Sequence, residues 1–473
     1  MLGRNVDGLR GWLVCMAAVA GLFGMVAGGV AAEGSAAGGG PRLDWDAASN
    51  RVTADIRDAS LEAVLQLVAS RTGWSVWVEP GLAGRVSTRF QDLPPGEALR
   101  RLLDRLNFTL LPQSNGPPHL YVFRTSMQDA TRPVRAAAEG PQAGSDRARI
   151  VGEWIVRLKP GTDPETLARA LGAEITGRIE ALRAYRFRFA TAEAAEAARQ
   201  RLLADDAVAS VEANYRMDRP PELQGVWTTS VGLPRVQPRK PDPGGGIVVA
   251  LVDTAVQPLP GPLNEFLLPG LQVAEGDGPP ADLPTHGTAM AQTLLRGLEM
   301  VSGPESKVRV LPVDIYGGRE VTSTFDLALG LYLAVYEGGA RLVNLSLGSQ
   351  ADSPLVHDVV RQVSGTGVLV VAAAGNEPTT APVYPAAYPE VVAVTAGDRS
   401  GGIAPYANRG EFVDVVAPGA SVVFYEGRPF LVMGTSAAAA FTSGLAAGLA
   451  ESRPGQMKDL LPALQAILGT PGR

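Results

Sequence analysis

Cysteine and histidine are scarce in this chain of 473 residues, which contains one cysteine and three histidines. The single cysteine, Cys15, lies in an apolar N-terminal segment, so the rest of the chain cannot form an internal disulfide bond. A basic stripe and an acidic tail are also missing, and the formal net charge of −6 is mild for this length. The sequence therefore gives no reason to expect nucleic acid, or a lipid surface, as the main partner.

The composition that remains is that of a folded protein. Hydrophobic residues make up 46% of the chain and charged residues 19%. The length predicts two or three domains rather than one core.

The first 32 residues have the layout of a secretory signal peptide. Arg4 and Arg10 precede an apolar core, and small residues ending in Val30-Ala31-Ala32 follow it, which favours cleavage after Ala32. An uncleaved anchor is the alternative, because roughly twenty apolar residues can just span a bilayer. We expect an exported protein that is periplasmic, bound at the cell surface, or secreted.

Residues 42–125 contain a short internal repeat. A shift of 34 residues superimposes Val52 on Val86, Asp58 on Asp92, and Trp74 on Phe108. Each copy predicts strand, helix, strand, and two such copies can bury their helices on a shared small sheet. This pattern resembles the short N-terminal domain of secretins and TonB-dependent transporters. The resemblance implies an envelope protein as the partner of residues 42–125, and a generic α/β domain without a partner remains the alternative.

Two further segments precede the C-terminal half. Residues 128–148 have almost no large apolar residues and predict a linker. Residues 149–217 predict the order βαββαβ, with Asp163 capping the first helix and Pro164 in its first turn. That order is typical of a split βαβ sandwich. A junction rich in proline and arginine follows at residues 218–246.

Residues 247–473 predict a doubly wound α/β domain, so the whole chain is α/β with two small α+β domains in front. Uniformly apolar runs such as "IVVALVD" and "GVLVVAAAGN" are expected of parallel strands buried on both faces. Ligands of such sheets bind at the carboxyl ends of the strands. Asp253 closes a strand, His286 opens a helix, and Ser436 precedes the alanine run "AAAA" at the start of another helix.

These three residues occur in the chain order aspartate, histidine, serine, which is the order known from subtilisin. Residues 247–465 resemble the subtilisin-like serine proteases. The matching stretches, in order, are "VALVDTAV", "HGTAMA", "VNLSLG", "AAAGN", "YPAAYPEVVAV", "YANRGEFVDVVAPG" and "GTSAAAA". The sequence departs from the family's usual residues at Ala255, Ala289, Ala437, Ala440 and Phe441, and none of these changes removes a catalytic group.

The resemblance implies a role for each site residue. Ser436 is the nucleophile, His286 the general base, and Asp253 the residue that orients the imidazole. Asn376 and the Ser436 backbone N–H are the donors to the oxyanion. The substrate pocket is expected at Ser346, Leu347 and Gly348, at Ala374 and Gly375, and at Val383. Because glycine is common where Val383 stands, we expect a shallow pocket for small or medium side chains.

The position of residues 149–217 in front of this domain resembles that of a subtilase propeptide. This predicts an intramolecular inhibitor that is removed by self-cleavage between Asn214 and Gly246, and polypeptides as substrates. No acidic cluster resembles a calcium loop and no cofactor is expected, although many relatives bind calcium. The alternative function is an envelope scaffold that is inactive, or that cleaves only itself, and acts through its N-terminal domain.

Overall fold

The structure is a computed structural model. It describes residues 42–46, 51–79, 81–104, 106–111, 118–127, 130, 132–134, 148–219, 224–225, 232–240, 246–276, 278, 282–398, 401–453, 455, 457 and on to 471. The predicted signal peptide lies outside the described residues. In the part of the chain that is described, no helix is long and apolar enough to cross a membrane.

The N-terminal domain contains the predicted strand–helix–strand repeat. Its elements are β1 (Arg42–Asp46), β2 (Arg51–Ser60), α1 (Leu61–Thr72), β3 (Ser75–Val78), β4 (Arg85–Leu93), α2 (Pro95–Leu103), β5 (Asn107–Leu111), β6 (His119–Phe123) and β7 (Arg132–Val134). The two copies also share a backbone feature. Asp58 and Asp92, which are 34 residues apart, both have a positive φ, of 48° and 53°.

Two expectations for this domain are corrected by its strand pairing. The repeats do not share one sheet, because β1, β2 and β4 form a three-stranded sheet while β5, β6, β3 and β7 form a four-stranded one. The strands that follow α1 and α2, which are β3 and β5, both belong to the four-stranded sheet. The buried residues of α1 and α2 share one core with residues of both sheets. The predicted linker also begins too early, because β7 pairs with β3 and Val134 is buried.

The second domain has the predicted βαββαβ order. It comprises β8 (Arg149–Leu158), α4 (Pro164–Leu171), β9 (Ala173–Ile179), β10 (Ala184–Phe189), α5 (Ala192–Ala204) and β11 (Val208–Asp218). The predicted cap is present, since an Asp163 carboxylate oxygen accepts a hydrogen bond from the Thr166 N–H at 3.0 Å. The sheet order β11-β8-β10-β9 continues beyond the domain, because the end of β11 pairs with β18 (Val321–Ser323) of the next domain.

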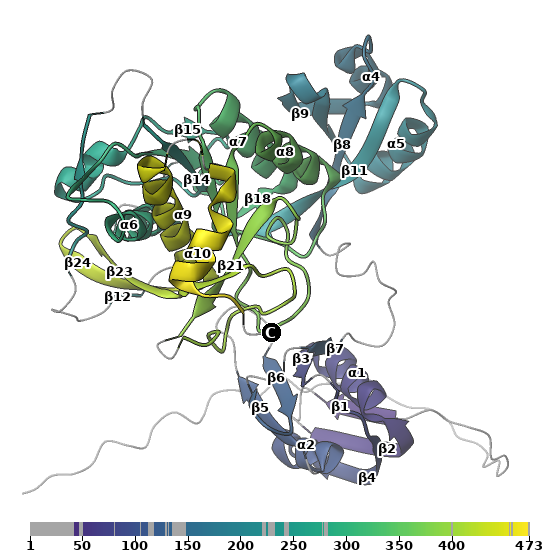
Figure 1. Cartoon of the computed structure of the whole chain (residues 1–473). Helices are drawn as coiled ribbons and strands as arrows, with labels where there is room; N and C mark the ends of the chain where they lie inside the picture. The colour runs from purple at the N-terminus through teal and green to yellow at the C-terminus, as the bar shows by residue number, and fades with distance from the viewer. Residues whose placement is uncertain are drawn as a thin grey trace, which may run out of the picture. The chain divides into compact units, whose positions relative to one another are not determined.

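A seven-stranded parallel sheet organises the C-terminal domain (Figure 1). Its order is β15 (Leu271–Gln272), β17 (Arg309–Asp314), β14 (Val248–Asp253), β19 (Leu342–Leu345), β20 (Leu369–Ala373), β21 (Val391–Gly397) and β22 (Val415–Pro418). One face packs on α6 (His286–Glu299), α9 (Thr435–Ser452) and α10 (Leu461–Leu468). The other face packs on α7 (Thr324–Tyr336) and α8 (Pro354–Gly365). The doubly wound fold is confirmed.

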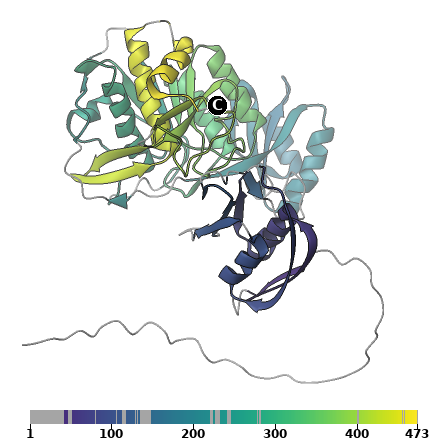
Figure 2. The same ribbon diagram turned by 60° about the horizontal axis from the view of Figure 1, so that its bottom comes forward.

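Smaller elements complete the domain. A hairpin of β23 (Ala420–Tyr425) and β24 (Arg428–Met433) leads directly into α9, and β24 also pairs with β12 (Gln224–Gly225). The remaining elements are β13 (Gln237–Pro238), β16 (Glu305–Ser306) and the 3-10 turns at Glu180–Leu182, Gly261–Phe266 and Met457–Asp459. Helices α6 and α9 lie side by side against the sheet in both views (Figure 1 and Figure 2).

Candidate active site

Asp253 and His286 form a hydrogen-bonded pair at the carboxyl edge of the central sheet. Asp253 is the last residue of β14 and only 1% exposed, and His286 is the first residue of α6. The Nδ1 of His286 lies 2.8 and 2.9 Å from the two carboxylate oxygens of Asp253. A carboxylate at Nδ1 holds the imidazole with its other nitrogen, Nε2, free to take a proton.

Thr254 and Thr285 fix the carboxylate and the imidazole in place. The Thr254 N–H donates to Asp253 Oδ1 at 2.7 Å, and the Thr254 hydroxyl accepts a hydrogen bond from the Gly287 N–H at 2.8 Å. Thr285 caps α6, because its hydroxyl accepts a hydrogen bond from the Thr288 N–H at 3.1 Å. The end of β14 and the start of α6 are thus tied together, which holds the backbone of His286 next to Asp253.

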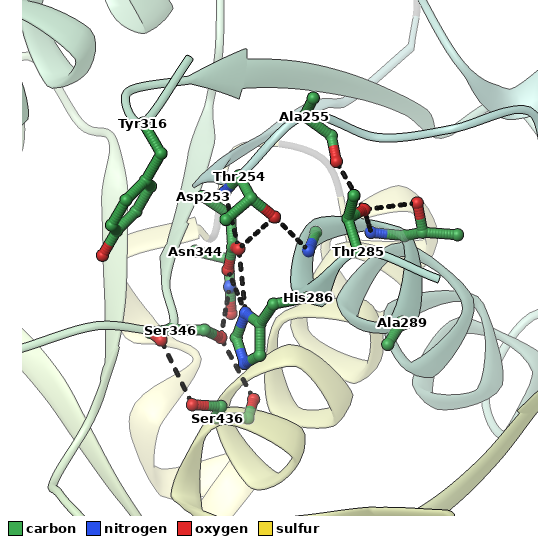
Figure 3. A network of polar contacts seen from close by, with 12 residues as sticks. Asp253, Thr254, Ala255, Thr285, His286, Ala289, Tyr316, Asn344, Ser346 and Ser436 are labelled. Carbon is green, nitrogen blue, oxygen red and sulfur yellow. Dashed lines mark hydrogen bonds and ion pairs between the residues drawn. The ribbon is translucent and has the colours of Figure 1, made fainter. Parts of the chain in front are cut away.

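Ser436 lies in the first turn of α9, on the side of His286 away from Asp253 (Figure 3). Its hydroxyl donates to the Ser346 carbonyl at 3.1 Å, and the Ser346 hydroxyl donates back to the Ser436 carbonyl at 3.1 Å. The resting hydroxyl therefore bonds to the chain after β19 rather than to His286. The hydroxyl must leave the Ser346 carbonyl before it can donate to the imidazole.

Asn376 follows β20 and lies against the turn that precedes Ser436. Its Oδ1 accepts hydrogen bonds from the Thr435 N–H at 2.8 Å and from the Thr435 hydroxyl at 3.1 Å. The amide nitrogen lies 3.0 Å from the position that a Cβ on Gly434 would occupy. Gly434 has a φ of 144°, so glycine suits this position both by conformation and by space. With Oδ1 occupied, the Nδ2 group is the donor that Asn376 can offer to a substrate.

The six residues predicted to form the substrate pocket follow β19 and β20 or lie near them, but they differ in exposure. Four of them are buried, whereas Gly348 is exposed and Gly375 partly exposed; the buried ones are Ser346, Leu347, Ala374 and Val383, at 1%, 6%, 0% and 7% exposed. A Cβ on Gly348 would lie 2.7 Å from a Val383 methyl group, and one on Gly375 would lie 3.4 Å from the other. Val383 therefore fills the space between the two glycines.

Several residues near the site were not predicted from the sequence. Asn344 in β19 donates to the Ser346 hydroxyl at 2.8 Å and accepts from the Ser443 hydroxyl at 2.9 Å, which supports the strand end under Ser436. Asn408 is fully buried beside Gly375, and its amide atoms have no partner in the described chain. Asparagines within an apolar run such as "LVNLS" are the only sequence signal for such supports.

Tyr316 links the second domain to this edge of the sheet. Its hydroxyl donates to the Asp218 carbonyl at the end of β11, at 3.2 Å. Burial, followed by the negative charge of Asp253, raises the pKa of Tyr316, so the phenol stays protonated.

Burial also raises the pKa of Asp314, although the N–H groups of Gly317 and Tyr316 oppose this. Among the described residues, no group of three or more histidine, cysteine or acidic side chains could hold a metal ion.

The fold and the site together define a class: a doubly wound α/β domain with an aspartate, a histidine and a serine at the carboxyl edge of its sheet. Comparisons with known proteins give the family. The model of the subtilase family matches residues 244–465, and that of the fervidolysin N-terminal prodomain matches residues 136–214. The chain belongs to the subtilase family.

Individual relatives are similar over less than half of the chain. Subtilisin Savinase of Lederbergia lenta is 33% identical over 215 residues, which are 45% of this chain and 78% of that protein. The thermophilic serine proteinase of Bacillus sp. (strain AK1) is 33% identical over 210 residues, 43% of this chain and 52% of the relative. The chain thus spans about half the length of some curated relatives that it matches.

A solved structure extends the likeness in fold beyond the C-terminal domain. The crystal structure of fervidolysin from Fervidobacterium pennivorans, described as a keratinolytic enzyme related to subtilisin, superimposes with a TM-score of 0.52. The match has 20% sequence identity and covers 67% of this chain and 57% of that one.

Proposed function

We propose that this chain is an exported serine endopeptidase that hydrolyses polypeptides through Asp253, His286 and Ser436. The observation that carries the proposal is the pairing of a buried carboxylate with His286 Nδ1 at 2.8 Å, with Ser436 on the opposite side of the ring (Figure 3). The named relatives, which include a serine proteinase and subtilisins, support the same activity.

The proposed mechanism begins with the rotation of the Ser436 hydroxyl from Ser346 to His286. As the serine oxygen attacks the peptide carbonyl, His286 takes its proton at Nε2, and Asp253 stabilises the imidazolium without accepting the proton. The oxyanion receives hydrogen bonds from Asn376 Nδ2 and from the Ser436 N–H in the first turn of α9, where amide groups lack helical partners. His286 then returns the proton to the leaving amine, and water hydrolyses the acyl-enzyme by the same route.

The first test is labelling of the full-length chain and of its processed form with a fluorophosphonate, which modifies only an activated serine. Labelling that is lost in Ser436→Ala and in His286→Ala would support the endopeptidase. An unlabelled but folded chain would instead favour the inert scaffold, and labelling without cleavage of any added protein would favour an enzyme restricted to itself.

The second domain acts, in this proposal, as an intramolecular inhibitor. Its match to a subtilase prodomain supports the role. So do its contacts, because β11 adds an antiparallel strand to β18, and Arg186 forms a 2.9 Å ion pair with Asp326 in which both side chains are largely buried. While β11 is paired with β18, no other extended chain can form hydrogen bonds with that part of β18.

Removal of this domain by self-cleavage would activate the enzyme. The bond lies, in our proposal, between Asn214 and Gly246, and the pairing of β11 through Asp218 favours a bond beyond that residue. A Ser436→Ala chain that stays intact beside a clipped wild type would support self-cleavage. Identical full-length bands for both would exclude it.

The N-terminal part of the chain would export the enzyme and retain it in the cell envelope. The signal-like residues 1–32 support export, and the repeat in residues 42–125 supports a docking domain for an envelope protein. N-terminal sequencing of the mature protein tests both ideas. A mature N-terminus after Ala32 is expected, and one at Met1 would indicate an anchor instead.

A further inference from the structure

A cavity of about 490 Å³ lies at the end of the central sheet opposite to the catalytic residues. Ile247 directly precedes β14, and Lys307 and Arg341 come just before β17 and β19, so the cavity opens at the amino ends of these strands. Asp253 closes the other end of β14, about 20 Å away for a strand of this length. The cavity is therefore separate from the active site, and its volume is in the range of small-molecule sites.

Four cationic side chains from four separate segments line this cavity: Arg239, Lys307, Arg341 and Arg453. The only described acidic residue in the lining is Glu451, and its carboxylate is already engaged by the Ser306 hydroxyl and the Lys307 N–H, both at 2.6 Å. The described lining thus has an excess of positive charge, within a chain whose net charge is −6.

Three of these cations have no partner in the part of the chain that the structure describes. Among the described residues, the side chains of Arg239, Arg341 and Arg453 form neither an ion pair nor a hydrogen bond. Some arginines elsewhere in the described chain do pair with carboxylates, as Arg186 pairs with Asp326. All three arginines are exposed to solvent, and an anion in the cavity could form charge-assisted hydrogen bonds with them.

The cavity also has an apolar part. Ile247, Ala450 and Met457 contribute to the lining, and Met457 is only 7% exposed. The carboxyl end of α9 lies nearby and repels a bare anion, because its last carbonyl groups carry partial negative charge. A ligand that combines an anionic head with a short apolar body matches the cationic side chains and the apolar lining. Its apolar body can lie against the end of α9, where a bare anion would be repelled.

We propose that this cavity binds a small amphiphilic anion, with its phosphate or carboxylate group held by Arg239, Arg341 and Arg453 and its apolar part against Ile247 and Met457. A guanidinium fork suits both oxyanions, because each accepts two parallel hydrogen bonds. The site is independent of the proposed peptidase activity, so each can fail without the other.

Isothermal titration of the full-length Ser436→Ala chain with four probes tests the proposal. Hexyl phosphate and hexanoate carry both features, inorganic phosphate only the charge, and hexanol only the apolar body. We expect at least one amphiphilic anion to bind more tightly than phosphate, and hexanol not to bind. The tighter of the two identifies the head group. Absence of binding by both amphiphilic anions, or binding of hexanol with equal affinity, would overturn the proposal.

Variants locate the binding. Arg341→Gln and Arg453→Gln should each weaken binding about tenfold, the usual cost of a lost charge-assisted hydrogen bond. Arg361→Gln is the matched control, since this arginine lies on α8 and pairs with Asp358. Equal affinities in Arg341→Gln and Arg361→Gln would contradict the assigned site. Binding should also weaken as salt is raised, which a purely apolar contact would not show.

Discussion

The side-chain amide of Asn376 has an oxygen that is hydrogen-bonded within the chain and a nitrogen that can donate to a substrate. Its Oδ1 is held by Thr435, so the Nδ2 group can donate to an oxyanion. Asn376→Ala should lower kcat by about 10²- to 10³-fold with little change in KM, because the donor acts in the transition state. Steady-state kinetics on a peptide substrate measure both constants.

A second variant separates the lost donor from a lost support. Asn376→Asp keeps an oxygen acceptor for Thr435 but replaces the donor with a negative charge. It should fold normally and lose at least as much kcat as Asn376→Ala. A kcat within threefold of wild type in either variant would exclude Asn376 as an oxyanion donor.

Val383 is the residue that we propose limits the depth of the substrate pocket. Its methyl groups lie beside the Cα atoms of Gly348 and Gly375, and the side chain is 7% exposed. Val383→Gly should open this space and move the peptide-library preference from small or medium side chains toward Phe and Tyr. Val383→Ala should shift the preference in the same direction, but less. A wild type that already prefers Phe or Tyr would contradict the shallow pocket.

At the scale of elements, glycines control how closely α6 approaches α9. A Cβ on Gly444 would lie 1.8 Å from the Leu294 carbonyl oxygen, and one on Gly297 would lie 1.9 Å from that of Phe441. His286 is the first residue of α6, and Ser436 is the second residue of α9. Their separation therefore also sets the distance between the imidazole and the hydroxyl.

Gly444→Ala should force these helices apart. Overpacking of this kind costs about 1–3 kcal/mol of unfolding free energy, so the melting temperature should fall by several degrees, and kcat should fall with it. Thermal unfolding and peptide hydrolysis are the measurements. Gly365→Ala is the control, because no atom lies within 4 Å of its added Cβ. Wild-type stability in Gly444→Ala would refute the close contact.

The sequence predicted most elements of the sheet because buried parallel strands are uniformly apolar. The run "IVVALVD" became β14 and "EVVAVTAG" became β21, each within a residue or two of its predicted limits. The hairpin of β23 and β24 was not predicted, since "ASVVFYEGRPFLVM" combines charged and apolar residues without the long apolar run that marked the other strands.

The sequence indicated the candidate catalytic residues but not the residues that support them. Asp253, His286 and Ser436 could be found because each is a chemically distinctive residue at the end of an element. Thr254, Thr285 and Asn344 act through hydrogen bonds between segments that are distant in sequence, and spacing alone does not reveal such contacts. The exposure of Leu347 and Ala374 likewise depended on how the strands pack.

At the scale of the whole molecule, the second domain shares a core with the peptidase domain. Ile155, Ile179 and Met217 are buried in the same apolar cluster as residues of α7 and α8. The contact also contains polar groups. Glu212 of β11 accepts hydrogen bonds from the Ser353 hydroxyl at 2.8 Å and from the Leu355 N–H at 3.1 Å, at the start of α8.

The protonation of Glu212 should make this contact depend on pH. Burial raises its pKa to about 7, although the hydrogen bonds from Ser353 and Leu355 and the charge of Arg157 oppose this, while Asp358 reinforces it. A carboxyl group with a raised pKa in the folded chain prefers the protonated form there. Its contribution to stability is therefore fully present below about pH 4.5 and is lost as the pH rises through 7.

Glu212→Gln in the Ser436→Ala background measures this contribution, because glutamine keeps the acceptor oxygen and cannot ionise. At pH 8 the glutamine variant should be more stable than its parent by up to about 3 kcal/mol, and the difference should vanish toward pH 4.5. Thermal unfolding across this range gives the curve, and Glu196→Gln on the exposed side of α5 is the control. A difference that stays constant with pH, or that grows toward acid, would show that Glu212 is ionised throughout. In that case alkaline pH would not weaken the contact between the second domain and the C-terminal domain, and release of the proposed inhibitor would depend on cleavage alone.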